Sequence, residues 1–112
     1  MTVIEIRTYR LRPGTQADYH RVVTDQVMPL LAEFGVRVVR YGPSEQDEDG
    51  VTDYVLIRAF ESHADRDEQE ERFYGSAQWR DGPREAIMSR IESYHTVVLT
   101  AASTAPDALR GD

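Results

Sequence analysis

The sequence predicts a single α+β domain whose elements follow the order β-α-β-β-α-β. Its 112 residues suit one domain with one modest core. Segments with strand-like alternation or β-branched composition are separated by segments with apolar residues at helical spacing. Glycine and proline punctuate the boundaries between these segments, which supports the division.

The first half of the chain predicts a strand followed by a long helix. Residues 3–11 are rich in β-branched side chains that alternate with polar ones, which is typical of a strand. Apolar residues then recur every three or four positions as far as Phe34, and Gly35 ends this helix. Pro29 lies inside the apolar stripe and removes a backbone donor, so we expect a kink or break near residues 27–28.

Two further strands and a charged segment follow. Strands are predicted over residues 36–41 and 53–60, joined by a long polar loop that resembles the tip of a hairpin. Ser62 is a candidate helix cap, and the residues from there to Arg72 are almost wholly charged. We expect a short surface helix at this place.

The last part predicts a helix, a strand and a tail. The helix begins at Pro83 and carries its apolar face through Ile91, and a strand follows over residues 94–100. Residues 1–100 then form the domain, and the small, polar residues 101–112 are expected to be a flexible C-terminal tail unless a partner subunit holds them. The complete order matches ferredoxin-like folds, in which an antiparallel sheet carries helices on one face and the first and third strands are central.

Composition excludes several function classes. The formal charge is −7, and the acidic residues gather in Glu45–Asp49 and Glu61–Glu71, so neither nucleic acid nor a membrane is an expected partner. All the basic residues are arginine, which excludes lysine Schiff-base chemistry. Cysteine is absent, which excludes thiolate catalysis, disulfides and cysteine-bound metals.

Targeting and cofactor signals are also missing from the sequence. The first residues enter a strand without a charged and then apolar leader, so a cytoplasmic location is expected. No glycine-rich phosphate loop is present, and Ser76 lacks the surroundings of a serine nucleophile. The pair Glu92 and His95 has an E-x-x-H spacing without a second histidine, so no metal and no cofactor are predicted.

Ionisable residues on the two central strands are the main candidates for chemistry. Glu5, Arg7 and Tyr9 share one face of the first strand, and Tyr54 and Arg58 share one face of the third. One interpretation is a solvated face or a satisfied network at a dimer interface. The other is a pocket in which an arginine holds an anionic substrate while a tyrosine transfers a proton.

The connector over residues 73–84 is the second candidate. It holds aromatic residues, among them Tyr74 and Trp79, beside Arg80 and Arg84. The aromatic side chains either cover a cleft or plug the end of the sheet. The two arginines either form a cationic rim or pair with neighbouring acids.

Three blocks of sequence resemble the NIPSNAP family. They are E-x-R-x-Y with L-x-P-G over residues 5–14, YVLIRAF over residues 54–60 and FYGSAQWRDGPR over residues 73–84. The resemblance spans about residues 3–100. It implies a ferredoxin-like monomer whose sheet packs face to face with that of a second copy, forming a dimeric α/β barrel. Relatives in that wider superfamily include cofactor-independent monooxygenases, isomerases and cyclases, haem-degrading enzymes and proteins of unclear activity, so fold alone does not choose among them.

These observations define the expected function and its alternatives. We expect a homodimeric small-molecule enzyme without a cofactor, a monooxygenase, isomerase or cyclase acting on an aromatic or enolisable compound. The alternatives are a non-catalytic module that binds a ligand or a protein, and a haem enzyme with His63 or His95 as axial ligand. The expected catalytic residues are Arg7, Tyr9 and Arg58. The expected substrate-binding residues are Glu5, Tyr54, Tyr74, Trp79, Arg80 and Arg84.

Overall fold

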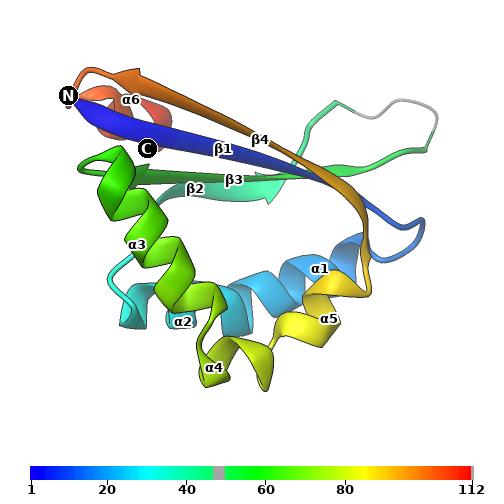
Figure 1. The fold of residues 1–112 in the computed structure, drawn as a ribbon. Helices are drawn as coiled ribbons and strands as arrows, with labels where there is room; N and C mark the ends of the chain where they lie inside the picture. The colour runs from blue at the N-terminus through cyan, green and yellow to red at the C-terminus, as the bar shows by residue number, and fades with distance from the viewer. Residues whose placement is uncertain (47–49, 112) are drawn as a thin grey trace.

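A computed structural model describes residues 1–46 and 50–111, and within them the chain forms one four-stranded antiparallel sheet (Figure 1). The strand order is β2-β3-β1-β4, so the first and third strands are central, as predicted. The tip of the predicted hairpin loop, residues 47–49, lies outside the described residues. The strands are β1 (Thr2–Leu11), β2 (Arg37–Pro43), β3 (Asp53–Phe60) and β4 (Ile91–Ala101).

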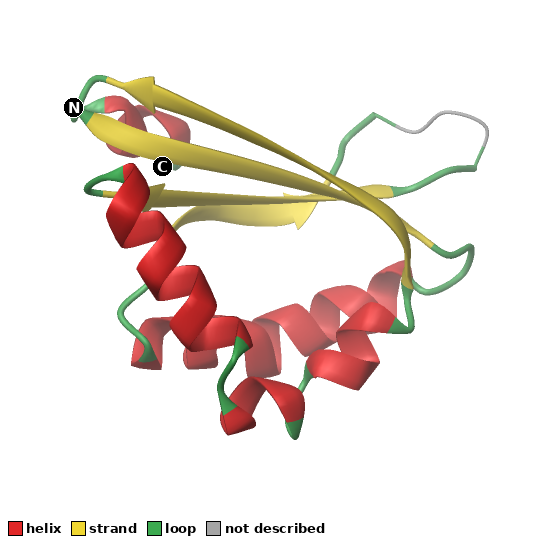
Figure 2. Cartoon of the chain, in the orientation of Figure 1, coloured by secondary structure: helices red, strands yellow, loops and turns green. Residues whose placement is uncertain are grey.

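Helices cover one face of the sheet, which confirms the predicted α+β architecture (Figure 2). The short helix α6 lies on the opposite face. The segments under the sheet are α1 (Gln16–Val22), the π-helical turn η1 (Val23–Val27), α2 (Met28–Glu33), α3 (His63–Tyr74), α4 (Ala77–Arg80) and α5 (Arg84–Met88).

The long helix predicted before Gly35 is interrupted, as expected from Pro29. The interruption is the π-turn η1, in which the Met28 N–H bonds to the carbonyl of Val23, five residues back. Because proline has no N–H, the regular four-residue ladder cannot continue through it, and α2 restarts with the proline in its first turn. Gly35, with φ +73°, ends the helix.

Helix α3 is longer than the short surface helix that its charged sequence predicts. It runs from His63 to Tyr74, and the Ser62 side chain accepts a hydrogen bond from the Asp65 N–H at 3.1 Å, as the cap pattern suggests. Two of its charged side chains, Arg66 and Glu70, turn toward ionisable groups of the sheet. These ion pairs hold α3 against the sheet although the helix has few apolar residues. The sequence prediction considered only apolar contacts and therefore made the helix too short.

The boundary between the last predicted helix and the last predicted strand lies earlier in the chain than expected. Helix α5 ends at Met88 and β4 begins at Ile91, so Arg90 and Ile91 do not belong to the helix. Ile91 instead pairs with Leu11 beyond a register shift in β1. Its apolar side chain is buried in either arrangement, which is why periodicity alone misassigns it.

The C-terminal residues form α6 (Ala105–Leu109), in contrast to the expected loose tail. Pro106 is fully buried, and Asp107 lies 3.6 Å from Arg37 of β2. The helix packs against β2 on the side of the sheet opposite α1 to α5. A short amphipathic segment can dock on a neighbouring sheet even where its own sequence has little periodicity.

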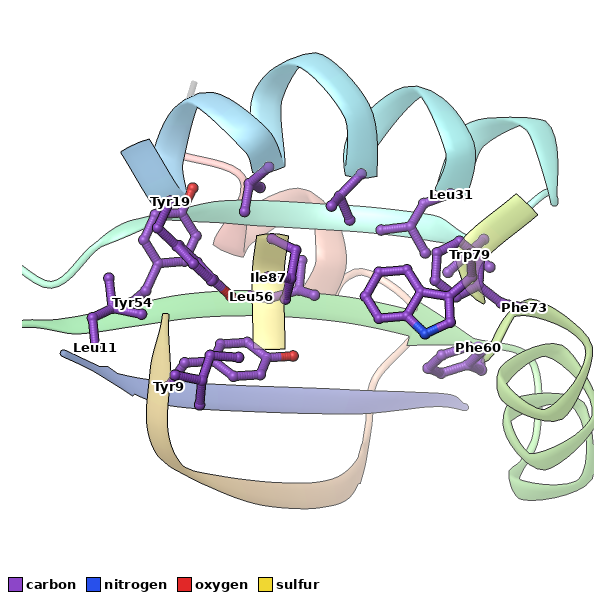
Figure 3. Close-up of a cluster of buried hydrophobic side chains, with 14 of the residues drawn as sticks. Tyr9, Leu11, Tyr19, Leu31, Tyr54, Leu56, Phe60, Phe73, Trp79 and Ile87 are labelled. Carbon is purple, nitrogen blue, oxygen red and sulfur yellow. The ribbon is translucent and has the colours of Figure 1, made fainter. Parts of the chain in front are cut away.

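The main core lies between the sheet and helices α1 to α5 (Figure 3). Each of these helices, together with β1 and β3, contributes at least one large buried side chain. The labelled members in the figure are Tyr9, Leu11, Tyr19, Leu31, Tyr54, Leu56, Phe60, Phe73, Trp79 and Ile87.

We expect Leu31→Ala to lower the free energy of unfolding by about 3 kcal/mol, because Leu31 is 1% exposed and the truncation leaves a cavity. Urea denaturation measures this loss. Leu109→Ala, at a side chain 39% exposed, serves as the control and should cost under about 1 kcal/mol. Equal losses in the two variants would contradict this assignment of the core.

Candidate functional site

A buried ion pair joins the two central strands beneath α3. Glu5 and Arg58 are directly opposite each other in the register of β1 and β3, and both side chains are essentially inaccessible to solvent. The Arg58 Nε donates to Glu5 Oε1 at 2.8 Å, and Nη2 donates to the same oxygen. Arg66 of α3 donates from Nε to the other oxygen, Oε2, at 2.6 Å. Both oxygens of the buried carboxylate therefore receive charged donors, as burial of a charge requires.

Arg7 and Glu70 extend this pair into a cluster of three guanidinium groups and two carboxylates. Arg7 Nη2 donates to Glu70 Oε1 at 2.9 Å, and Arg7 Nε donates to Glu5 Oε1 at 3.2 Å. Arg58 Nη2 also donates to Glu70 Oε1 at 2.9 Å. The cluster is held by β1, β3 and α3 together, so it forms only when the tertiary structure is complete.

The two carboxyl groups of the cluster have opposite pKa shifts. Burial by itself would raise the pKa of Glu5, but its hydrogen bonding with Glu70 and the charges of Arg58 and Arg7 outweigh burial and lower it to about 2. Burial raises the pKa of Glu70 to about 7, and the neighbouring Glu5 adds to this shift. Such a separation of two neighbouring carboxyl groups is typical of functional sites, though structural networks produce it too.

A cavity of about 350 Å³ lies beside this cluster, between the sheet and the helices. Arginine and tyrosine side chains supply its polar wall, and aliphatic and aromatic side chains supply the rest. This combination of an apolar cavity with a few convergent polar groups is the usual form of a small-molecule site. Its lining residues are Arg7, Tyr9, Tyr74, Trp79, Arg84, Ile87, Met88, Ile91 and Tyr94.

Arg7 connects the cavity to the buried cluster. It lines the cavity while its guanidinium group is fixed by both carboxylates and lies 5.4 Å from the ring centre of Tyr74. The Tyr74 hydroxyl accepts a hydrogen bond from Arg58 Nη1 at 2.9 Å. A cation in the wall is thereby held in one orientation before any ligand arrives, which is the preorganisation that binding and catalysis require.

Tyr9 is a neutral hydrogen-bond donor in the wall of the cavity. Burial, with a smaller contribution from Tyr74, raises the pKa of Tyr9 to about 12. Tyr9 is therefore neutral at physiological pH and donates a hydrogen bond rather than acting as a base. Tyr94 of β4, whose ring centre lies 6.3 Å from that of Tyr9, is 61% exposed at the cavity rim.

The structure brings five of the nine predicted site residues to this cavity. Glu5 and Arg58 lie behind its wall, in the buried cluster, and hold Arg7 and Tyr74 rather than facing the cavity. Tyr54 and Arg80 do not line it. The five that do are Arg7, Tyr9, Tyr74, Trp79 and Arg84.

Tyr54 belongs to a different environment from the one the sequence suggests. Its hydroxyl lies 2.6 Å from His20 Nδ1, and its ring packs on Tyr19 in the core. Burial raises its pKa above the usual range, with a smaller contribution from Tyr41. Tyr54 and Arg58 do share one face of β3, as predicted. They are four residues apart along the strand, which places their side chains about 13 Å from each other, in different environments.

Sequence reasoning missed Glu70, Arg66 and Tyr94. Arg66, Glu70 and Tyr74 recur at steps of four and so share one face of α3. This polar face of a helix, together with ionisable residues on a central strand, could have predicted the buried cluster. Nothing in the sequence distinguished Tyr94 from an ordinary strand residue.

The histidines do not gather at the cavity. His63 Nε2 lies 3.5 Å from the Thr100 hydroxyl, and His95 is opposite Thr8 in the strand register. Within residues 1–46 and 50–111, no group of three histidine, aspartate or glutamate side chains is arranged to hold a metal ion. The same residues include no helix long and apolar enough to cross a membrane.

We expect Arg58→Met to cost about 3–5 kcal/mol, because it leaves the Glu5 charge buried with one partner fewer. In the double variant Glu5→Leu/Arg58→Met the loss should be smaller than the sum of the single losses by more than about 1 kcal/mol, as urea denaturation would measure. The exposed pair Arg21 and Asp18 is the control, with a coupling energy below about 0.5 kcal/mol. Additive losses at the buried pair would contradict its role.

Comparisons with known proteins identify the family and the fold of the chain. A family model described as NIPSNAP matches residues 4–106. No curated protein matches the chain. Among solved structures, a NIPSNAP family protein of unknown function from Agrobacterium tumefaciens strain C58 is 30% identical, with a TM-score of 0.79 and coverage of 90% of this chain and 88% of that one.

Two more distant structures share the fold. An uncharacterized NIPSNAP domain protein from Burkholderia xenovorans is 22% identical, with a TM-score of 0.76 and coverage of 90% of this chain and 95% of that one. A candidate antibiotic biosynthesis monooxygenase from Caulobacter crescentus CB15 is 15% identical, with a TM-score of 0.63 and coverage of 91% of both chains. Because the family model covers nearly the whole chain, this protein belongs to the NIPSNAP family.

Proposed function

We propose that the protein is a small-molecule enzyme that acts on an aromatic or enolisable compound in the cavity beside Arg7, without a bound cofactor. The observation that carries the proposal is a cation fixed in the wall of an apolar cavity by a buried network. Monooxygenation, isomerisation and cyclisation of such compounds all pass through an enolate or phenolate. A fixed guanidinium group stabilises that oxyanion more than it stabilises the neutral substrate, and this difference is catalysis.

The other lining residues have matching roles in this proposal. Tyr74 and Trp79 provide aromatic surface against which a planar ring packs. Tyr9, kept neutral by its raised pKa, donates a hydrogen bond to the substrate oxygen. Arg84, exposed at the mouth, forms no hydrogen bond or ion pair with the other described residues and is available to an anionic substituent.

Monooxygenation is one of three reactions compatible with this site. The fold shared with a candidate antibiotic biosynthesis monooxygenase favours including it, and the NIPSNAP relatives supply no reaction. The competing proposal is a NIPSNAP module that binds its ligand in the same cavity without turning it over. Polyhydroxylated naphthalenes are test compounds that distinguish the two proposals. An enzyme would bind them and also consume oxygen or form a product, whereas a binding module would only bind them.

We expect the protein to bind 2-naphthoate, and Arg84→Ala to weaken this binding about tenfold, since a charge-assisted hydrogen bond contributes about 1.5–3 kcal/mol. Isothermal titration calorimetry measures both affinities. Arg21→Ala removes the same charge from α1, away from the cavity, and should leave the affinity unchanged. Equal effects of the two substitutions would show that only net charge matters and would contradict the proposed site.

The sheet face opposite α1 to α5, which also carries the short helix α6, supports the proposed homodimer. It carries Ile6, Ile57, Val97 and Leu99, of which Ile6 is opposite both Ile57 and Val97 in the register. Val97 and Leu99 are 43% and 44% exposed, which is unusual for large apolar residues that form a contiguous stripe. Packing against a second copy of the same face would remove this stripe from water.

We expect the chain to elute at twice its 12.8 kDa mass in size-exclusion chromatography with light scattering, and Leu99→Asp to shift it toward the monomer. A buried carboxylate at the centre of two packed apolar faces has no partner, so it opposes association. Ala17→Asp, which adds the same charge to the exposed side of α1, is the control. A monomeric protein, or a Leu99→Asp variant that stays dimeric, would rule out this face as the interface.

A further inference from the structure

Arg7 is shared between the cavity and a carboxyl group that sequence reasoning did not single out, Glu70. The Arg7 side chain lines the cavity, and its Nη2 donates to Glu70 Oε1 at 2.9 Å. The Glu70 side chain is 15% exposed, whereas Glu5 is fully buried. Of the two carboxyl groups in the cluster, Glu70 is therefore the one that can exchange a proton with solvent.

The partners of the two carboxyl groups also differ. Glu5 has a guanidinium group on each oxygen, from Arg58 and Arg66. In Glu70, one oxygen, Oε1, accepts from both Arg7 and Arg58, and these two arginines also bind Glu5. The second oxygen of Glu70, Oε2, lies 3.4 Å from Arg66 Nη2. Glu70 thus depends on guanidinium groups that are already engaged elsewhere.

We propose that the cavity takes an aromatic carboxylate or enolate at Arg7 and that Glu70 takes up one proton from solvent as this anion binds. The inference rests on the proposed function, because it assumes that the cavity is the binding site. A ligand anion and the Glu70 carboxylate compete for one guanidinium group, and arginine cannot lose its own proton. Protonation of Glu70 removes the like charge and leaves Arg7 to the ligand.

The surroundings of Glu70 favour this exchange. Glu5 and Arg7 of β1, Arg58 of β3 and Arg66 of α3 are the charged groups that contact it or one another in the cluster. On β4, the residues opposite Glu5 and Arg7 are Val98 and Thr96, which carry no charge. The raised pKa of about 7 places the proton exchange near physiological pH.

The sign of the pH dependence follows from this pKa. In the free protein Glu70 is ionised above about pH 7, and a bound anion raises its pKa further because like charges repel. Between these two pKa values each binding event takes up a proton, so affinity rises as pH falls toward 7 and levels off below 7. The limit for one proton is tenfold in affinity per pH unit.

Calorimetric titration of 2-naphthoate at pH 7.5 in phosphate and in Tris measures the proton uptake through the difference in buffer ionisation heat. A substantial fraction of a proton per site is expected for the wild-type protein, and none for the neutral methyl 2-naphthoate. Glu70→Gln should abolish the uptake and the pH dependence. Glu71→Gln makes the same change at the next residue of α3, an exposed position, and should retain both.

The outcomes separate this inference from the proposed function. Binding of 2-naphthoate without proton uptake overturns the role of Glu70 and leaves the site intact, as does uptake that persists in a folded Glu70→Gln variant. No binding of 2-naphthoate at any pH overturns both. The measurement on the wild-type protein needs no substitution, so it decides the matter even if Glu70→Gln fails to fold.

Discussion

The buried ion pair between Glu5 and Arg58 is the constraint on which the rest of the structure depends. Two charges without access to water require partners with good geometry, and these residues are directly opposite each other on the central strands. A slip of one residue in the register would turn one of them to the other face of the sheet. The pair also requires α3 to bring Arg66 and Glu70 against the sheet, which accounts for three helical turns in a nearly all-charged segment.

The distribution of ionisable and apolar residues between the two faces of the sheet is unusual. A sheet with one open face normally buries its apolar residues and exposes polar ones. Here the ionisable residues lie under helices α1 to α5, and the opposite face carries an apolar stripe across β3, β1 and β4. The arrangement keeps the polar network between the sheet and α3, and it leaves the opposite face for the proposed association.

Local charge at the cavity is opposite in sign to the charge of the whole chain. The formal charge is −7, yet Arg7 and Arg84 are the charged residues in the cavity lining. An anion is therefore repelled by the net charge of the chain and attracted by the arginines of this cavity, which favours selective binding. Because Glu70 shares Arg7, the strength of that attraction is set by a carboxyl group beside the cavity rather than in it.

The sequence by itself determined the order of the four strands and which two are central, and it singled out five of the residues that line the cavity, because alternation, turn residues and apolar spacing are local properties of the chain. It grouped Glu5 with Arg7 on one face of β1 and Arg58 with Tyr54 on one face of β3, and the strand register that sets Glu5 opposite Arg58 came from the structure. It did not reveal that the helices cover those faces, since the period of a strand says which residues share a side and not which side is buried. Glu70, Tyr94 and the docking of α6 were decided by tertiary structure alone, because each depends on contacts between residues far apart in the chain.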